Sequence, residues 1–377
     1  MKKKRFTRLK YIAVAAVLLF LLLPDATSNS MQITARALVT AIGVDRTAEG
    51  GFEVTAQLIL PQNSTDSPQA QDFVTSKGRT VKTAVDGVTA KTGKRANLAH
   101  CKLLFLGVSA LDAGLADSLD FFLRSPEIDN GIMVAAASGA AKDAVKKLSG
   151  LDKLSAFALP DFLSQNNTNG LNSVVTLKNF SESYYSGIGD LILPVIEIAE
   201  KSDGEKDEGG EEDGNPDFPA AELSDDFKTA VIKDGRLVRV LGKDDTRRLM
   251  WLDKKAKTGT LPIENGDERI ALEIKGKRVK TKAVFKGGKP VYQINIFLNL
   301  SADERQGSAT DIKAAAREQI SADLQNLHRE CIAGDFDVMR INESFFRFKN
   351  KKYKAYKAAG GDILKDCAIE VKVFPRF

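Results

Sequence analysis

The chain has 377 residues, of which 43% are hydrophobic, and its 55 Lys and Arg against 50 Asp and Glu give a formal charge of +5. This composition is typical of a globular protein with a sizeable core. Three cysteines and two histidines are too few and too scattered for a disulfide scaffold or for a zinc site built on these ligands. Cys331 and Cys367 could form one bridge or remain reduced, and we expect buried, reduced thiols.

The first 30 residues have the pattern of an export signal. Six Lys and Arg occupy the first ten positions, an apolar run of 13 residues follows from Tyr11 to Leu23, and a short polar exit ends at Ser30. The run is shorter than the ~20 residues that comfortably span a bilayer. Residues 1–30 are therefore predicted to be a cleaved signal peptide or a retained short anchor. No cysteine lies there, which excludes lipid modification, and the positive head predicts an extracytoplasmic location for the rest.

Residues 31–199 alternate strand and helix patterns, which predicts one or more N-terminal α+β domains. Strands are expected at Ala35–Asp45, Phe52–Leu60, His100–Gly107, Gly131–Ala137 and Asp190–Ala199, with a loop at Pro61–Asp72. Helices are expected around Val81–Val88, over Leu111–Phe122, at Ala141–Leu148 and at Leu151–Leu163, the last with a break or kink at Pro160. Pro194 places the last strand at a sheet edge or a bulge.

An acidic segment separates the two halves. Lys201–Asp226 carries eleven acids against two lysines, a charge of −9, and almost no apolar residues before Phe218. Such a stretch cannot bury enough surface to offset its chain entropy. Residues 200–226 are therefore predicted to be a disordered linker.

Residues 227–377 are predicted to be a C-terminal α+β domain that opens with a hairpin turning at Asp234-Gly235. Asp244, Asp245 or Thr246 is expected to cap a short helix, with Trp251 in the core. Strands are then expected at Arg269–Ile274, Arg278–Phe285 and Val291–Leu300, with turns at Gly276 and Gly287–Pro290. A long helix follows over Ile312–Cys331, and a strand over Ile369–Val373 closes the chain. The fold class is α+β, with mixed β-sheets and packed helices in two or three small domains.

The sequence contains no catalytic, cofactor or metal motif at an adequate spacing. Asp335 and Asp337 could pair for acid–base work on a strand, but they follow Gly334, which favours a turn or cap. His100 and Cys101 are adjacent, so on a strand they would face opposite sides, and a structural histidine is favoured. We therefore predict a protein that is not an enzyme and needs no cofactor or metal, and no ligand-binding residue is assigned.

The segment Phe345–Tyr356 interleaves cations with aromatic residues. Export argues against nucleic acid as its partner. Anionic lipid headgroups or a partner protein could meet such a patch. A solvated charged helix face, with its aromatic side chains in the core, is the interpretation that we favour.

Taken in order, four segments resemble the Ger(x)C family of bacterial spore germination proteins, the C subunits of germinant receptors. They are Ala37–Asp45, the region of His100 with Leu119–Ile128, the hairpin and helix at Thr229–Leu252, and Asp311–Phe377. The chain departs from the family pattern in two places. It lacks the usual lipobox cysteine before the first strand, and Arg247 stands where the family has Gly.

The resemblance implies a non-enzymatic, membrane-associated receptor subunit that takes part in triggering germination. It implies a place on the outer face of the spore inner membrane, beside integral-membrane A-type and B-type subunits. The receptor ligands would be small nutrients, none assignable to residues of this chain. An exported solute-binding protein and a secreted cell-wall enzyme are the alternatives. The first would need two similar lobes, and the second a convergent acid pair in a cleft.

Overall fold

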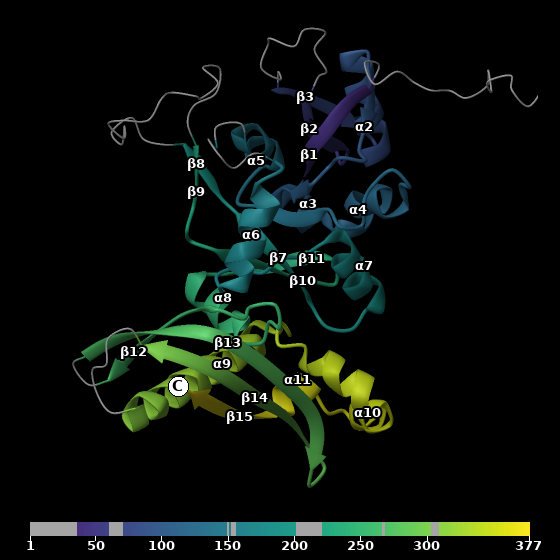
Figure 1. Cartoon of the computed structure of the whole chain (residues 1–377). Coiled ribbons are helices and arrows are strands. Elements are labelled where there is room, and N and C mark those ends of the chain that lie inside the picture. The colour runs from purple at the N-terminus through teal and green to yellow at the C-terminus, as the bar shows by residue number, and fades with distance from the viewer. Residues whose placement is uncertain are drawn as a thin grey trace, which may run out of the picture.

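The computed structural model describes residues 36–59, 71–148, 151, 156–200, 221–265, 268–302 and 309–377. The predicted export segment and residues 201–220 of the predicted linker lie outside these ranges. Figure 1 shows two stacked bodies, with β1 in the upper one and the C-terminus in the lower one. Both bodies combine sheets with packed helices, which confirms the predicted α+β class.

The upper body is built on a mixed sheet of nine strands. Their order is β11-β10-β7-β6-β5-β1-β2-β3, and β4 also pairs with β1. Neighbours from β1 through β5 and β6 to β7 are parallel, whereas the outer pairs are antiparallel. The strands are β1 (Arg36–Arg46), β2 (Phe52–Ile59), β3 (Gln71–Gly78), β4 (Arg95–Asn97), β5 (Leu103–Leu106), β6 (Met133–Ala137), β7 (Leu191–Ile196), β10 (Lys228–Lys233) and β11 (Arg236–Leu241).

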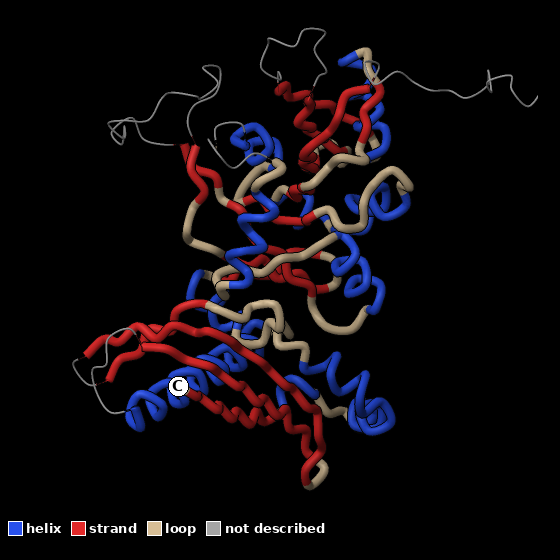
Figure 2. Tube along the Cα trace, viewed as in Figure 1, coloured by secondary structure: helices blue, strands red, loops and turns tan. Residues whose placement is uncertain are grey.

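Helices cover both faces of this sheet, as Figure 2 shows. One face packs on α2 (Val81–Thr92), α4 (Leu115–Arg124) and α7 (Leu177–Ser186) through Val85, Leu119 and Phe180. The other packs on α5 (Ala141–Lys147) and α6 (Leu159–Thr168) through Val145 and Leu163. The central strands are therefore buried on both sides, which explains their nearly continuous apolar sequences.

Asp45 connects the end of β1 to the start of α5. Its two carboxylate oxygens accept the backbone N–H groups of Ala141 and Lys142, each at 2.9 Å. Burial raises the pKa of this carboxyl, although the two N–H donors oppose that shift. A Cβ on Gly107 would lie 1.8 Å from an Asp45 oxygen, so this close approach requires glycine.

Replacing Asp45 by Ala should lower the free energy of unfolding by about 1–3 kcal/mol, because two buried N–H groups lose their acceptor. Denaturant unfolding measures this change. Asp143→Ala removes an exposed acid from the first turn of the same helix and should cost less than about 0.5 kcal/mol. Equal losses for the two variants would contradict the role given to Asp45.

The lower body is a four-stranded sheet with helices on one face. The strand order is β12-β13-β14-β15, and only β14 and β15 are parallel. Ile294 and Ile296 pack against Ile320 and Leu327 of the long helix α9 in a single core. The elements are β12 (Gly259–Asn265), β13 (Glu268–Lys286), β14 (Lys289–Ala302), α9 (Ala309–Gly334), α10 (Ile341–Ala358), α11 (Ile363–Asp366) and β15 (Ala368–Arg376).

The predicted hairpin forms, but it belongs to the upper sheet. Asp234 and Gly235 have φ values of 51° and 77°, the left-handed pair that a type I′ turn requires. β10 pairs antiparallel with β7, so the hairpin is added to a sheet made by residues before the acidic segment. Ala230 and Ile232 enter the upper core, whereas Val231 enters the lower core. Strand β10 therefore contributes to the cores of both bodies. The division into separate domains at residues 31–199 and 227–377 stays a prediction.

Several local expectations are corrected by the structure. The helix predicted over Leu151–Leu163 begins only at Leu159, which agrees with the break predicted at Pro160, because the fixed φ of proline suits a first helical turn. Gly114, at φ 114°, divides the predicted helix over Leu111–Phe122 into α3 (Val108–Ala113) and α4. Gly276 lies beside a register shift within the single strand β13 and makes no turn.

Two further corrections concern strands. Pro194 lies inside the sheet, between β6 and β10, and not at an edge. On the β6 side, only Val195 and Ile196 of β7 are paired. Pro194, which has no N–H to donate, lies one residue before these paired residues. Ala221–Leu223, predicted as linker, forms β9 and pairs with β8 (Ile198–Glu200). The strands β3 and β12 and the helix α7 were not predicted.

Candidate ligand pocket at the junction of the two halves

The main candidate site is a cavity of about 790 Å³ where the two bodies meet. The loop that follows α6 lines it from above, and β12, β13 and α9 line it from below. The helix α8 (Lys243–Met250) lies between them in Figure 1. A volume of this size falls within the range of small-molecule sites. The pocket is therefore a feature of the junction and of neither body alone.

The placement of α8 follows from its buried side chains. Leu249 and Met250 join the lower core, and the buried Thr246 hydroxyl donates to the Thr229 hydroxyl of β10 at 3.1 Å. The expected side-chain cap is wrong, because the helix begins after Gly242 and no side chain caps it. Asp244 and Asp245 lie in the first turn, where acids favour the helix dipole. α8 thereby carries Trp251 to the pocket wall.

Trp251 is half-buried: it packs against the lower core, as expected, and it also lines the pocket. Its indole N–H donates to Asp323 Oδ2 on α9 at 3.2 Å. The Arg248 guanidinium lies 3.5 Å from the other oxygen of Asp323 and 2.7 Å from Asp245. These contacts fix the indole and leave part of it at the cavity surface.

Lys277 is the least expected residue of the pocket, because it faces the core side of the sheet. After the register shift between Ile274 and Gly276, Lys277 pairs with Leu298 and shares its face with Val279. Bulges re-aim side chains and occur often beside functional sites. Nothing in the sequence indicates this orientation, because Gly276 has the pattern of an ordinary turn.

The Lys277 ammonium donates to the Met250 carbonyl and lies 5.8 Å from the centre of the Trp251 ring. Burial lowers its pKa to about 8, and the charge of Asp253 opposes this shift only in part. Among the described residues, no carboxylate lies within ion-pairing distance of this amine. The pocket thus contains a half-buried cation whose charge is not neutralised by a direct ion pair.

The remaining charged groups of the pocket are nearly balanced. Arg247, which stands at the position where the resemblance expected Gly, is exposed and lines the cavity. The acids Asp244, on α8, and Glu273, on β13, also line the cavity. A mixed set of this kind can hold a polar or charged small molecule, and the aromatic and apolar walls can hold its carbon skeleton.

Backbone contacts lock the loop after Trp251 onto the upper body. The carbonyl of Thr168 accepts the N–H groups of Lys257 and Thr258, each at 2.9 Å. Asn167 Nδ2 donates to Asp253 at 2.8 Å. A Cβ on Gly259 would lie 2.4 Å from the Asn169 carbonyl oxygen, so only glycine allows this approach. The pocket shape therefore depends on how the two halves are docked.

Asp335 and Asp337 do not form an acid–base pair. Asp337 is buried and accepts the N–H groups of Ile341 and Asn342 at 2.9 and 2.7 Å, which begins α10. Asp335 is exposed and contacts the Lys233 ammonium on the hairpin. The turn-or-cap interpretation is confirmed.

A second polar junction lies beside this cap. The Asp337 N–H donates to Asp190 Oδ2, before β7, at 2.6 Å. Burial raises the pKa of Asp190 to about 6. This carboxyl therefore holds the segment between α9 and α10 to the upper body.

The other sequence candidates are not brought together either. His100 is exposed in a turn, so it is not a satisfied buried histidine, while Cys101 is buried. Burial raises the pKa of the Cys101 thiol to about 12, which makes it a poor nucleophile. Cys331 and Cys367 are buried free thiols, as expected. Within the described ranges, no three metal-binding side chains converge.

The basic and aromatic segment is helix α10, with a non-helical residue at Lys349. Phe345 is fully buried, and Tyr356 lies against Phe285, with ring centres 5.8 Å apart. The favoured interpretation thus holds for most of its aromatic residues. Phe348 differs, since 73% of its surface is exposed.

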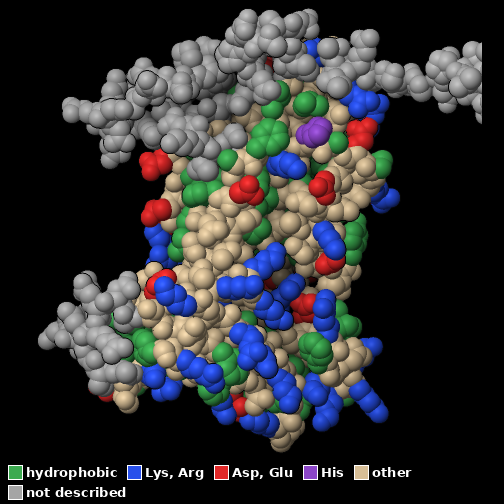
Figure 3. Space-filling view, viewed as in Figure 1, with side chains coloured by type: hydrophobic (Ala, Val, Ile, Leu, Met, Phe, Trp, Pro, Cys, Tyr) green, Lys and Arg blue, Asp and Glu red, His purple; other side chains and the backbone are tan. Residues whose placement is uncertain are grey.

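Positive charge also covers the sheet face opposite α9. Lys and Arg gather over the lower body in Figure 3. Arg278, Phe297 and Phe374 lie in one cross-strand row, with the two phenyl rings stacked at 4.9 Å. Residues 228–377 carry 32 Lys and Arg against 20 Asp and Glu, a charge of +12. The cationic surface is thus wider than α10.

Comparison with known proteins identifies the family. The model described as "Spore germination protein N-terminal domain" matches residues 29–198, and "Spore germination B3/ GerAC like, C-terminal" matches residues 228–374. The chain belongs to the Ger(x)C family of spore germination proteins. The acidic segment lies between the two matched ranges, and the second range begins with the shared strand β10.

Two relatives come from Bacillus subtilis (strain 168). Spore germination protein B3 is 27% identical over 263 residues, 68% of this chain and 64% of the relative, so the match spans less than two thirds of that protein. Spore germination protein KC is 23% identical over 96% of this chain and 93% of its own length. The solved structure titled "Crystal Structure of the GerBC protein" has a TM-score of 0.51 at 18% identity, covering 89% and 96% of the two chains. It supports the shared fold.

Lys277→Met should make the protein more stable at pH 7, because it removes a buried charge and retains the side-chain length. Lys277 has a pKa of about 8 when folded and an ordinary value of 10.5, so the unfolded chain holds the proton more tightly. Wild-type stability should therefore rise with pH across this interval, and the advantage of the variant should shrink by on the order of 3 kcal/mol.

Denaturant unfolding at several pH values checks this expectation. Lys282→Met provides the matched control, because Lys282 is exposed on the outer face of the same strand. A difference between Lys277→Met and wild type that does not change with pH would show that Lys277 is not held as a buried cation.

Proposed function

We propose that this protein is the non-enzymatic C subunit of a nutrient germinant receptor, and that it takes part in triggering spore germination. In this proposal it lies on the outer face of the spore inner membrane, beside an integral-membrane A-type and a B-type subunit. The single observation that carries the proposal is the match of two spore germination domain models, in order, across residues 29–198 and 228–374.

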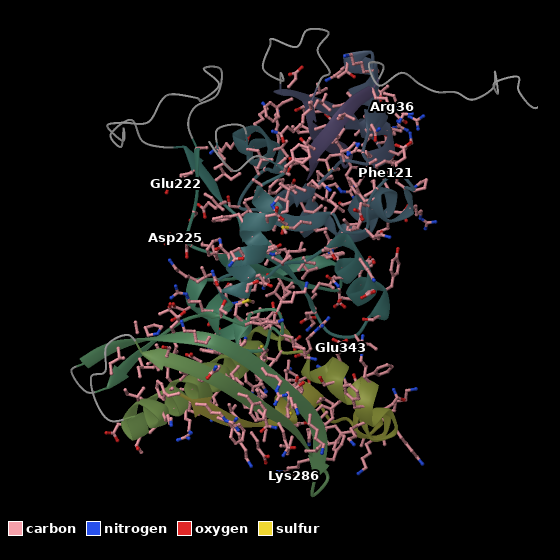
Figure 4. All side chains as sticks on the ribbon, in the orientation of Figure 1. Arg36, Phe121, Glu222, Asp225, Lys286 and Glu343 are labelled. Carbon is pink, nitrogen blue, oxygen red and sulfur yellow. The ribbon has the colours of Figure 1, made fainter. Side chains whose placement is uncertain are left out.

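The arrangement of the chain is compatible with attachment at one end. Arg36, the first described residue, lies near the top of Figure 4, and Lys286 lies at the lower tip. The predicted signal or anchor precedes Arg36. Among the described helices, none has the length and apolar character needed to cross a bilayer. A retained anchor at residues 1–30 would therefore tether the upper body and direct the cationic lower body away from its point of attachment.

The alternatives receive less support from the fold. A solute-binding protein of two similar lobes is disfavoured, because one body contains a nine-stranded mixed sheet and the other a four-stranded sheet. A wall enzyme would need two carboxylic acids facing a substrate. Asp335 and Asp337, the acids that the sequence suggested, instead bind Lys233 and the start of α10.

A genetic experiment tests the proposal. Deleting the gene in its spore-forming host should slow or abolish germination with at least one nutrient, measured as the loss of optical density of a spore suspension. The full chain should restore the response and appear in the membrane fraction. A variant without residues 2–24 should restore nothing, because it lacks the export head.

Two results would contradict the proposal. Full restoration by the variant without residues 2–24 would remove the need for export or anchoring. Release of soluble fragments from cell wall by the purified protein would favour the enzyme alternative. Palmitate labelling gives a further check, because a chain without a cysteine near its N-terminus should incorporate none.

A further inference from the structure

We propose that the junction pocket binds a small organic carboxylate, with the Lys277 ammonium holding the carboxylate group and Trp251 holding the carbon skeleton. This inference extends the proposed receptor function to a ligand site on this chain. It rests on the geometry of the pocket, so its test requires no spores.

The first argument is the position of Lys277. An ammonium on the core side of a sheet loses most of its hydration and is costly unless an anion or hydrogen-bond acceptors replace the lost water. The Met250 carbonyl supplies one acceptor, whereas the ammonium has three donors. No described carboxylate forms an ion pair with it. Lys277 lines the cavity, so an anion that enters the cavity and reaches its amine can accept the remaining hydrogen bonds.

The second argument concerns the carbon skeleton of the ligand. Trp251 lies beside Lys277, with 5.8 Å between the ammonium and the ring centre. Leu261 and Ile274 add apolar wall to the same cavity. A molecule with a carboxylate at Lys277 can therefore place an apolar group on the indole. The Asp323 bond keeps the indole in position without using the ring face.

The third argument selects a single negative charge. Three cations line the pocket, namely Arg247, Arg248 and Lys277. Three acids line it as well, namely Asp244, Glu273 and Asp323. A balanced set gives little support to a phosphate dianion. A monocarboxylate, or an amino acid whose ammonium meets one of the acids, fits this balance better.

Binding at this place would affect the whole molecule. Asn169 and Leu171 of the upper body and β12, β13 and α9 of the lower body line one cavity. A ligand that contacts both would stabilise one docked arrangement over others, to the extent that its affinity for the arrangements differs.

The protein contains one tryptophan, Trp251, so its intrinsic fluorescence reports directly on the pocket. The full chain, purified in detergent micelles, is titrated with 3-phenylpropionate, 4-methylpentanoate and L-leucine, and separately with the primary amide of each. We expect a saturable change in Trp251 emission with at least one carboxylate. Its amide, which has nearly the same shape without the negative charge, should bind at least about tenfold more weakly.

Lys277→Met tests the assigned counter-ion, and Lys282→Met is the control on the outer face of the same strand. The first should weaken carboxylate binding by about tenfold or more, and the second should leave it unchanged. Circular dichroism and unfolding curves establish that both variants are folded. If Lys277→Met does not fold, Lys277→Gln replaces it, with Lys282→Gln as its control.

Equal responses to acid and amide, unchanged binding in the folded Lys277 variant, or no response to any carboxylate up to about 10 mM would each overturn the proposal. Binding should also weaken as the pH rises above the pKa of the amine. The experiment is independent of germination. A failed titration leaves the receptor assignment standing, and a gene deletion without phenotype leaves a positive titration standing.

Discussion

The antiparallel pairing of β10 with β7 is the contact on which the arrangement of the whole protein depends. It returns the chain to the upper sheet after the acidic segment, before the lower sheet is built. Alternating side chains of β10 then enter different cores, Ala230 and Ile232 above and Val231 below. Because successive residues of a strand face opposite sides, one short strand can join two hydrophobic cores. Relative movement of the halves would disturb packing on both faces.

The position of α8 follows directly from this pairing. The helix comes immediately after β11, and its buried residues pack into the lower core while Thr246 bonds to β10. Trp251 and the loop to Thr258 are thereby held against the end of α6. These backbone contacts set the distance between the upper body and the lower sheet, and the cavity is the space left between them. A site at such a junction responds to any change in docking, which suits a protein that participates in signalling.

Charge is distributed in keeping with this architecture. The acidic segment lies between the halves in sequence, and the excess of Lys and Arg lies in the C-terminal half. Most of these cations remain in water, where their charge costs little. Lys277 is different, since the bulge in β13 directs it into the interior beside Trp251. A buried ammonium without an ion pair opposes folding, which makes it a candidate for function.

Local features of this chain could be predicted from its sequence, because they depend on neighbouring residues. The Asp234-Gly235 turn needs two residues that tolerate positive φ, and α9 follows from the apolar spacing over Ile312–Cys331. The order of four segments was also enough to indicate the family. These local patterns could not reveal which sheet the hairpin joins, because its apolar residues could be buried in the core of either body.

The pocket was likewise decided by the tertiary structure. Trp251, Lys277 and Asp323 are far apart in the chain and meet only when α8, β13 and α9 pack together. In the sequence, Lys277 is one of many lysines near a glycine, and nothing marks the register shift that turns it inward. The sequence by itself determined the Asp234-Gly235 turn, the apolar face of α9 and the family, through local backbone preference and segment order. The tertiary structure alone decided which strand joins the two halves and which charge is buried, because both depend on pairing between distant segments.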